Sequence, residues 1–119
     1  MRPDRLLLED ILESIREVME TTPPSRRAYD RDKLVRSHLV RHIQIIGEAA
    51  SRVSTELKQA NPHVPWRAIT GMRHAIVHDY FEIDWNEVYN TAIRDIPSLQ
   101  LPILSILSHL PAELGTSPR

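Results

Sequence analysis

Residues 73–80 contain the side chains of this chain that are best suited to chemistry, namely Arg73, His74, His78, Asp79 and Tyr80. Arginine presents a planar fork of donors that suits a phosphate, and it stays charged. Histidine is the side chain that most readily moves a proton near neutral pH. Together these groups suit cleavage of an RNA phosphodiester. An imidazole would move the proton of the 2′-hydroxyl or of the leaving oxygen, a guanidinium would stabilise the phosphorane, and no metal is needed.

The spacing of these residues limits how they can act together. Each helical residue advances about 100° around the axis, so Arg73 and Tyr80 lie within about 20° of each other, and His74 and His78 within about 40°. Arg73 and His78 are about 140° apart on the same helix. A regular helix therefore cannot aim Arg73 and His78 at one point. Either the helix breaks near Val77, or a second copy of the chain completes the site across a symmetric dimer.

The elements that must position these residues are helices. Apolar residues recur every three to four positions along most of the chain, and no strand-like alternation extends beyond a few residues. We therefore expect an all-α, up-and-down bundle of four to five helices. The expected helices cover residues 2–19, 32–60, 66–77 and 84–96, followed by an apolar segment over 99–110. At Pro97 and Pro102 the last part is expected either to kink or to restart.

Capping residues and one glycine give more specific predictions. Asp84 with Glu87 three residues later matches a capping box, which predicts that a helix begins there. Gly47 lies inside the second helix, where glycine costs roughly 1 kcal/mol relative to alanine. Its presence indicates either the close approach of another backbone or a plain weak spot in the helix.

The composition is that of an ordinary globular chain. We expect a single domain over residues 1–119, with a frayed tail at about 111–119. The absence of cysteine excludes disulfides, zinc–thiolate sites and thiol nucleophiles. No apolar run approaches the ~18 residues of a membrane span, and the N-terminus lacks the pattern of a secretory signal, so we expect a cytoplasmic protein. The net charge of −1 means that nucleic-acid binding would need a local basic patch.

The central stretch lies within a wider pattern. Arg73, His78 and Tyr80 match the motif R-x4-H-x-Y. The other matching segments are I-G-E-A at 46–49, P-W-x-x-I-x-G-M-R at 65–73 and D-I-P at 95–97. In this order they resemble the HEPN-domain ribonuclease toxins of HEPN/MNT toxin–antitoxin pairs, the HepT-like group, over nearly the whole chain.

This resemblance implies a HEPN bundle that works as a homodimer, with two motifs facing each other in a cleft. It implies a metal-independent endoribonuclease toxin of a type VII system, without a cofactor, in which Arg73 and His78 are the catalytic pair. The implied partner is an MNT-domain nucleotidyltransferase antitoxin that transfers AMP from ATP to Tyr80, which would block RNA by bulk and charge. The family usually has asparagine after the motif arginine. This chain has His74 there, which leaves the division of roles between His74 and His78 open.

Several candidates also have structural interpretations. Glu48 or Asp79 could pair with Arg73, and Glu48 near Arg73 would orient its guanidinium. His38 and His42 lie four apart and could ligate zinc. Because the chain has no cysteine and no H-E-x-x-H frame, we expect these two histidines to be polar positions at a helix edge, and we predict no metal site. Two other functions stay open: a non-catalytic nucleotide- or substrate-binding subunit of a nucleotidyltransferase pair, and a structural dimer whose motif only supports packing.

Overall fold

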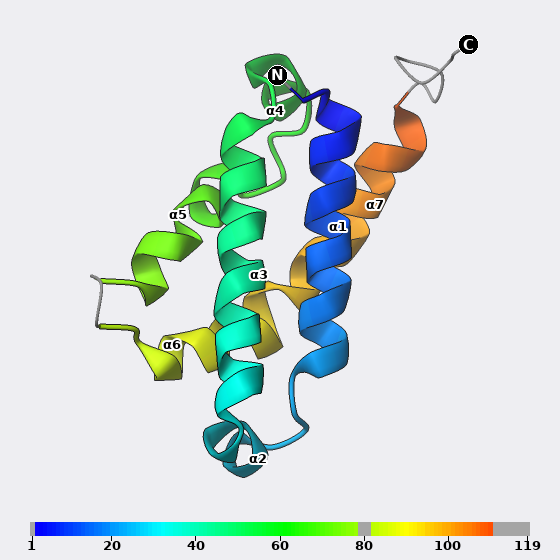
Figure 1. The fold of residues 1–119 in the computed structure, drawn as a ribbon. Coiled ribbons are helices and arrows are strands. Elements are labelled where there is room, and N and C mark those ends of the chain that lie inside the picture. The colour runs from blue at the N-terminus through cyan, green and yellow to red at the C-terminus, as the bar shows by residue number, and fades with distance from the viewer. Residues whose placement is uncertain (1, 79–81, 111–119) are drawn as a thin grey trace.

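A computed structural model describes residues 2–78 and 82–110, which are almost entirely helical and confirm the predicted all-α fold. The α-helices are α1 (Asp4–Thr21), α2 (Arg26–Arg31), α3 (Lys33–Arg52), α4 (Thr55–Ala60), α5 (Trp66–Ile76), α6 (Trp85–Asn90) and α7 (Gln100–His109). A π-helical segment, η1 (Thr91–Asp95), and a 3₁₀ turn, η2 (Pro97–Leu99), lie between α6 and α7. The longer helices lie side by side in the order α5, α3, α1, α7 (Figure 1). The described helices include none long and apolar enough to span a membrane.

The antiparallel pair α1 and α3 is the centre of the bundle (Figure 1). Both helices carry the apolar stripe that the sequence predicts, and the stripes face each other. Leu8 and Ile15 of α1 and Leu39 and Ile43 of α3 are completely buried. Each such aliphatic side chain contributes roughly 1.5–3 kcal/mol through burial. Short α2, which the sequence prediction missed, turns the chain from α1 into α3 and buries Tyr29 completely.

The predicted continuous helix over residues 32–60 is wrong, because the structure contains two helices there. Between α3 and α4, Val53 is extended, with φ −62° and ψ 141°. The Ser54 hydroxyl caps α4. Asp4 of α1 in turn accepts hydrogen bonds from the backbone N–H of Ser54 at 2.9 Å and from its hydroxyl at 2.6 Å. The break therefore depends on a contact from the first turn of α1, 50 residues away in the sequence, which local periodicity cannot reveal.

Helix α5 packs against α3 at Gly47. A Cβ atom on Gly47 would lie 3.3 Å from the carbonyl oxygen of Ile69 and 3.4 Å from that of Thr70. This confirms the close backbone approach that was one of the two explanations for the glycine. Ile69 and Ile76 bury the apolar face of α5. Gly47 therefore sets how near α5 lies to α3, and with it the position of Arg73.

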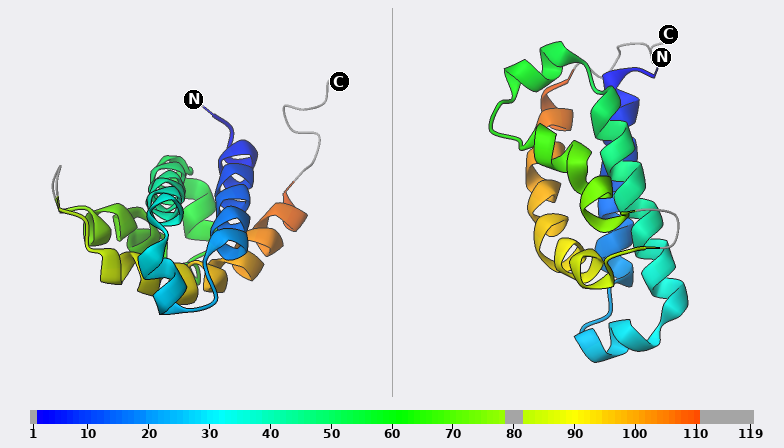
Figure 2. Two further views of the ribbon diagram at one scale, coloured as in Figure 1. Left: turned by 60° about the horizontal axis from the view of Figure 1, so that its bottom comes forward. Right: turned by 90° about the vertical axis from the view of Figure 1, so that its left-hand side faces the viewer.

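The segments α6, η1, η2 and α7 follow one another almost without interruption and run across the back of α3 and α1 (Figure 2). Asp84 accepts a hydrogen bond from the N–H of Glu87 at 3.0 Å, which confirms the predicted cap of α6. The backbone changes from π to 3₁₀ geometry at Pro97, which has no N–H to continue an α-helical ladder. Pro102 lies in the first turn of α7, where backbone N–H groups lack helical partners in any case. The helical path thus restarts at Pro97, and α7 continues through Pro102.

The predicted frayed tail, residues 111–119, lies outside the described residues.

Candidate active site

The helix that carries Arg73 ends before it reaches His78. Helix α5 stops at Ile76, and Val77 is extended, with φ −116° and ψ 105°. Of the two alternatives that the spacing left open, the structure contains the helix break near Val77. The separation of about 140° that a regular helix would impose on Arg73 and His78 does not apply to this chain.

A short antiparallel bridge fixes the segment after α5. Val77 pairs with Ile83, and the N–H of His78 donates to the carbonyl of Glu82 at 2.9 Å. Val77 and Ile83 are partly buried against the core. Because successive side chains of an extended segment alternate in direction, His78 points away from the core and is exposed. The bridge was not predicted, although β-branched residues at both of its positions are a typical strand signal.

A groove of about 530 Å³ extends along α1, α3 and α5, and Arg73 is part of its lining. Its polar lining consists of Arg2, Asp10, Arg41, Gln44, Glu48, Arg52 and Arg73. Within the described part of the chain, Arg41 and Arg73 form no ion pair, whereas the other two arginines bind the two carboxylates. The groove is thus a local basic patch on a chain whose net charge is −1.

Glu48 lines the same groove as Arg73, but its carboxylate binds another arginine. Arg52 donates to Glu48 Oε2 from Nη2 at 2.8 Å and from Nε at 3.1 Å. Both side chains are 62% exposed, and an exposed pair of this kind contributes only about 0–1 kcal/mol. The role of Glu48 as a support for Arg73 stays a prediction.

Among the hollows formed by described residues, Arg73 and His78 line different ones. His78 lines a separate hollow of about 370 Å³ together with residues 82–84. His74 is exposed in the last turn of α5. Asp79 and Tyr80 follow His78 directly and lie outside the described residues. In the part of the chain that the structure describes, the two proposed catalytic residues therefore line different hollows, with Arg73 in the last turn of α5 and His78 just after the helix end.

Sequence reasoning did not reveal that Arg41 lines the same groove as Arg73. Arg41, Glu48 and Arg52 are seven and four residues apart, so they share one face of α3. That spacing was visible in the sequence as the polar side of the α3 stripe. What the sequence could not show is that α5 brings Arg73 to the same face.

Comparisons with known proteins find one family. The chain matches the ribonuclease HepT-like family over residues 11–106. A Thermococcus cleftensis protein named "Probable ribonuclease HepT" is 35% identical over 94 residues, which cover 78% of this chain and 86% of the relative. "Putative RNase TTE0752" of Caldanaerobacter subterraneus is 31% identical over 108 residues, covering 90% and 96%. "Putative RNase MJ1380" of Methanocaldococcus jannaschii is 31% identical over 100 residues, covering 83% and 92%. No solved structure gives a significant match.

Proposed function

Because the chain belongs to the ribonuclease HepT-like family, we propose that it is a metal-independent endoribonuclease and the toxin of a type VII HEPN/MNT toxin–antitoxin pair in the cytoplasm. The observation that carries this proposal is the position of Arg73. Its guanidinium lines a groove rich in arginine, and the helix end next to it presents His78 to solvent. Phosphate binding and proton transfer are thus available on adjoining surfaces.

RNA phosphates are proposed to bind along the groove through Arg41 and Arg73. These two guanidiniums have no ion-pair partner among the described residues, so binding a phosphate displaces no internal salt bridge. Arginine binds phosphate through two parallel hydrogen bonds, which gives direction as well as charge. The groove is open along α3, as a site for a polymer backbone requires.

The proposed reaction is a transfer within the RNA. An imidazole, His78 in this proposal, takes the proton of a 2′-hydroxyl, and the 2′-oxygen attacks the adjacent phosphorus. Arg73 stabilises the charge that develops on the phosphorane oxygens. The bond from phosphorus to the 5′-oxygen breaks, and that oxygen receives a proton from a histidine or water. The products are a 2′,3′-cyclic phosphate and a 5′-hydroxyl, so no external oxidant, reductant or metal enters the balance.

A homodimer is proposed to complete the site. Among the described residues of one copy, Arg73 and His78 line different hollows, and a second copy facing the first would bring two Arg73 and two His78 side chains around one RNA strand. The separation of the two residues across the end of α5 supports this arrangement. It also fits the spacing of the motif, in which four residues separate Arg73 from His78 and place the two outside a single helical turn.

Tyr80 is proposed as the switch. Its phenolic oxygen would attack the α-phosphate of ATP, held by the MNT-domain antitoxin, to form a tyrosine–AMP phosphodiester and release pyrophosphate. The added phosphate brings negative charge two residues from His78, which would repel RNA. The intact mass of the protein after co-expression with its nucleotidyltransferase should show one or more AMP groups. That mass increase should vanish in Tyr80→Phe; an increase that persists in Tyr80→Phe rejects Tyr80 as the acceptor.

The test of the ribonuclease itself uses purified protein, a synthetic RNA and EDTA. Arg73→Ala should lower the cleavage rate by about 10²–10³, the usual cost of removing one donor to a developing anion. Arg67→Ala is the matched control, because Arg67 is an exposed arginine on the same helix that does not line the groove. Equal activity of the Arg73→Ala and Arg67→Ala proteins would refute the assignment of Arg73.

A further inference from the structure

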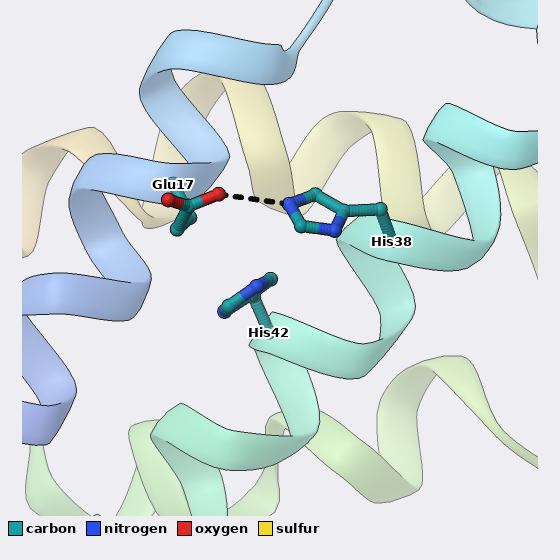
Figure 3. A group of neighbouring side chains, drawn as sticks. All are labelled: Glu17, His38 and His42. Carbon is teal, nitrogen blue, oxygen red and sulfur yellow. Dashed lines mark hydrogen bonds and ion pairs between the residues drawn. The ribbon is translucent and has the colours of Figure 1, made fainter.

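Three potential metal ligands converge between α1 and α3, and none of them lines the groove that contains Arg73 (Figure 3). Glu17 comes from α1, and His38 and His42 come from α3. One ligand atom from each of the three side chains lies within 4.8 Å of the others. Nε2 of His38 is 3.0 Å from Oε1 of Glu17. Two ligands bound at about 2.0–2.1 Å to a tetrahedral zinc ion would be roughly 3.3 Å apart, so this pair is already near the required spacing.

The helix geometry explains why the cluster forms. His38 and His42 are four residues apart, so their side chains lie one above the other on the same face of α3. Their ring centroids are 4.4 Å apart. The antiparallel packing of α1 on α3 places Glu17 opposite this face, and all three side chains are partly buried. The sequence pattern lacked a third ligand, and the tertiary structure supplies it from the other helix.

Ser14 gives His42 a defined orientation. The Ser14 hydroxyl lies 2.9 Å from Nδ1 of His42, and Ser14 is only 3% exposed. A histidine that binds a metal through one ring nitrogen almost always bonds a polar partner through the other. With Nδ1 held by Ser14, the Nε2 atom of His42 is the one left for a ligand. This buried hydroxyl is therefore placed as an outer-shell partner of a metal site would be.

We propose that Glu17, His38 and His42 bind one divalent first-row transition metal ion of the zinc class. Two imidazoles and one carboxylate favour such an ion over magnesium or calcium, which prefer oxygen ligands, and over copper(I), which prefers sulfur. Three protein ligands leave a fourth position for water. The ion would tie α1 to α3 and would take no part in RNA cleavage.

The test is a calorimetric titration of the full chain, freed of metal by a chelator that is then removed, with zinc chloride. The wild-type protein should bind one zinc ion per chain at this site. His42→Gln and Glu17→Gln should abolish that binding, and Ser14→Ala should weaken it about 10–100-fold, the usual cost of losing an outer-shell partner. His63→Gln is the matched control, because His63 is an exposed histidine outside the cluster and should bind zinc as the wild type does.

Two results would overturn the proposal. One is the absence of zinc binding by the wild type, which would leave the cluster as a hydrogen-bond network only. The other is zinc binding that is equal in Glu17→Gln and His63→Gln. Far-ultraviolet circular dichroism of each variant shows whether it is folded, and Glu17→Gln, at a partly exposed position, keeps the test valid if a histidine variant unfolds. Because RNA cleavage is assayed in EDTA, the outcome here is independent of the proposed ribonuclease activity.

Discussion

Gly47 and Gly71 form a matched pair that tests how α5 is held against α3. Both are helical glycines, but their surroundings differ. A Cβ atom on Gly47 would lie 3.3 and 3.4 Å from two backbone oxygens of α5, whereas one on Gly71 would meet no atom within 4 Å. Alanine in place of glycine inside a helix stabilises by about 1 kcal/mol where there is room for its methyl group. Gly71→Ala should therefore raise the free energy of unfolding by about 1 kcal/mol.

Gly47→Ala should not show this gain. The same helix preference operates, but the new methyl group presses on carbonyl oxygens of a packed helix, which cannot rotate away as the end of a long side chain can. Overpacking of this kind typically costs about 1–3 kcal/mol. The net effect of Gly47→Ala is then a loss of about 0–2 kcal/mol, and the two variants should differ by about 1–3 kcal/mol.

Urea unfolding followed by circular dichroism measures both values, at one fixed protein concentration because association would shift the midpoint. Equal slopes against urea would show that the variants unfold to the same extent. If Gly47→Ala stabilised the protein as much as Gly71→Ala does, the close approach of α5 to α3 would be refuted. The inferred position of Arg73 beside the α3 arginines would be refuted with it.

Three further predictions concern the cap of α4, the groove and a buried tyrosine. Ser54→Ala should lower the free energy of unfolding by about 0.5–2 kcal/mol, because the Ser54 hydroxyl caps α4 and also donates a hydrogen bond to Asp4. Thr55→Ala, at the next and exposed position, should change that free energy little. Equal effects of the two variants in urea unfolding would contradict the cap. Binding of single-stranded RNA can be measured by fluorescence anisotropy in a His78→Ala background, which prevents cleavage. There, Arg41→Ala should reduce the steepness of log binding constant against log salt concentration by about 0.7, whereas Arg67→Ala should leave it unchanged. An unchanged slope in Arg41→Ala would remove Arg41 from the RNA site. Burial raises the pKa of Tyr29 to about 12, so the folded state holds the phenolic proton more tightly than the unfolded state does. The contribution of this proton to the free energy of unfolding should therefore be fully present below about pH 10 and be lost as the pH rises from about 10 to 12. Tyr29→Phe should show a smaller alkaline loss in unfolding experiments across that range, and an identical loss would place the alkaline transition elsewhere.

Local patterns in the sequence were sufficient to predict α1, α5 and the start of α6. The apolar stripe of α1 and the cap at Asp84 were predicted because both depend on residues within one or two turns. The end of α3 was not predicted, because Asp4 of α1 holds Ser54 at the break. The bridge between Val77 and Ile83 was missed for a related reason, since a two-residue pairing is too short to show a strand period.

The candidate site, like the fold, could be predicted from the sequence only in part. The motif residues Arg73 and His78 were recognised from their side-chain chemistry and motif, and helical geometry left a break between them as one of two alternatives. The groove could not be inferred, because Arg41 is far from Arg73 in sequence and the two line one groove only through the packing of α5 on α3. Glu17 is missing from the sequence prediction for the same reason, since it meets His38 only where α1 and α3 pack together.

The most direct test of the central claim compares His78 with His74 in a single-turnover cleavage assay in EDTA. Both are exposed histidines at the end of α5, so their variants disturb the fold similarly. If His78 moves the proton, His78→Ala should slow cleavage by about 10²–10⁴. His74→Ala should slow it by less than about tenfold, as expected for an exposed charge that only helps to hold phosphate. Cleavage by His78→Ala at close to the wild-type rate would contradict the account.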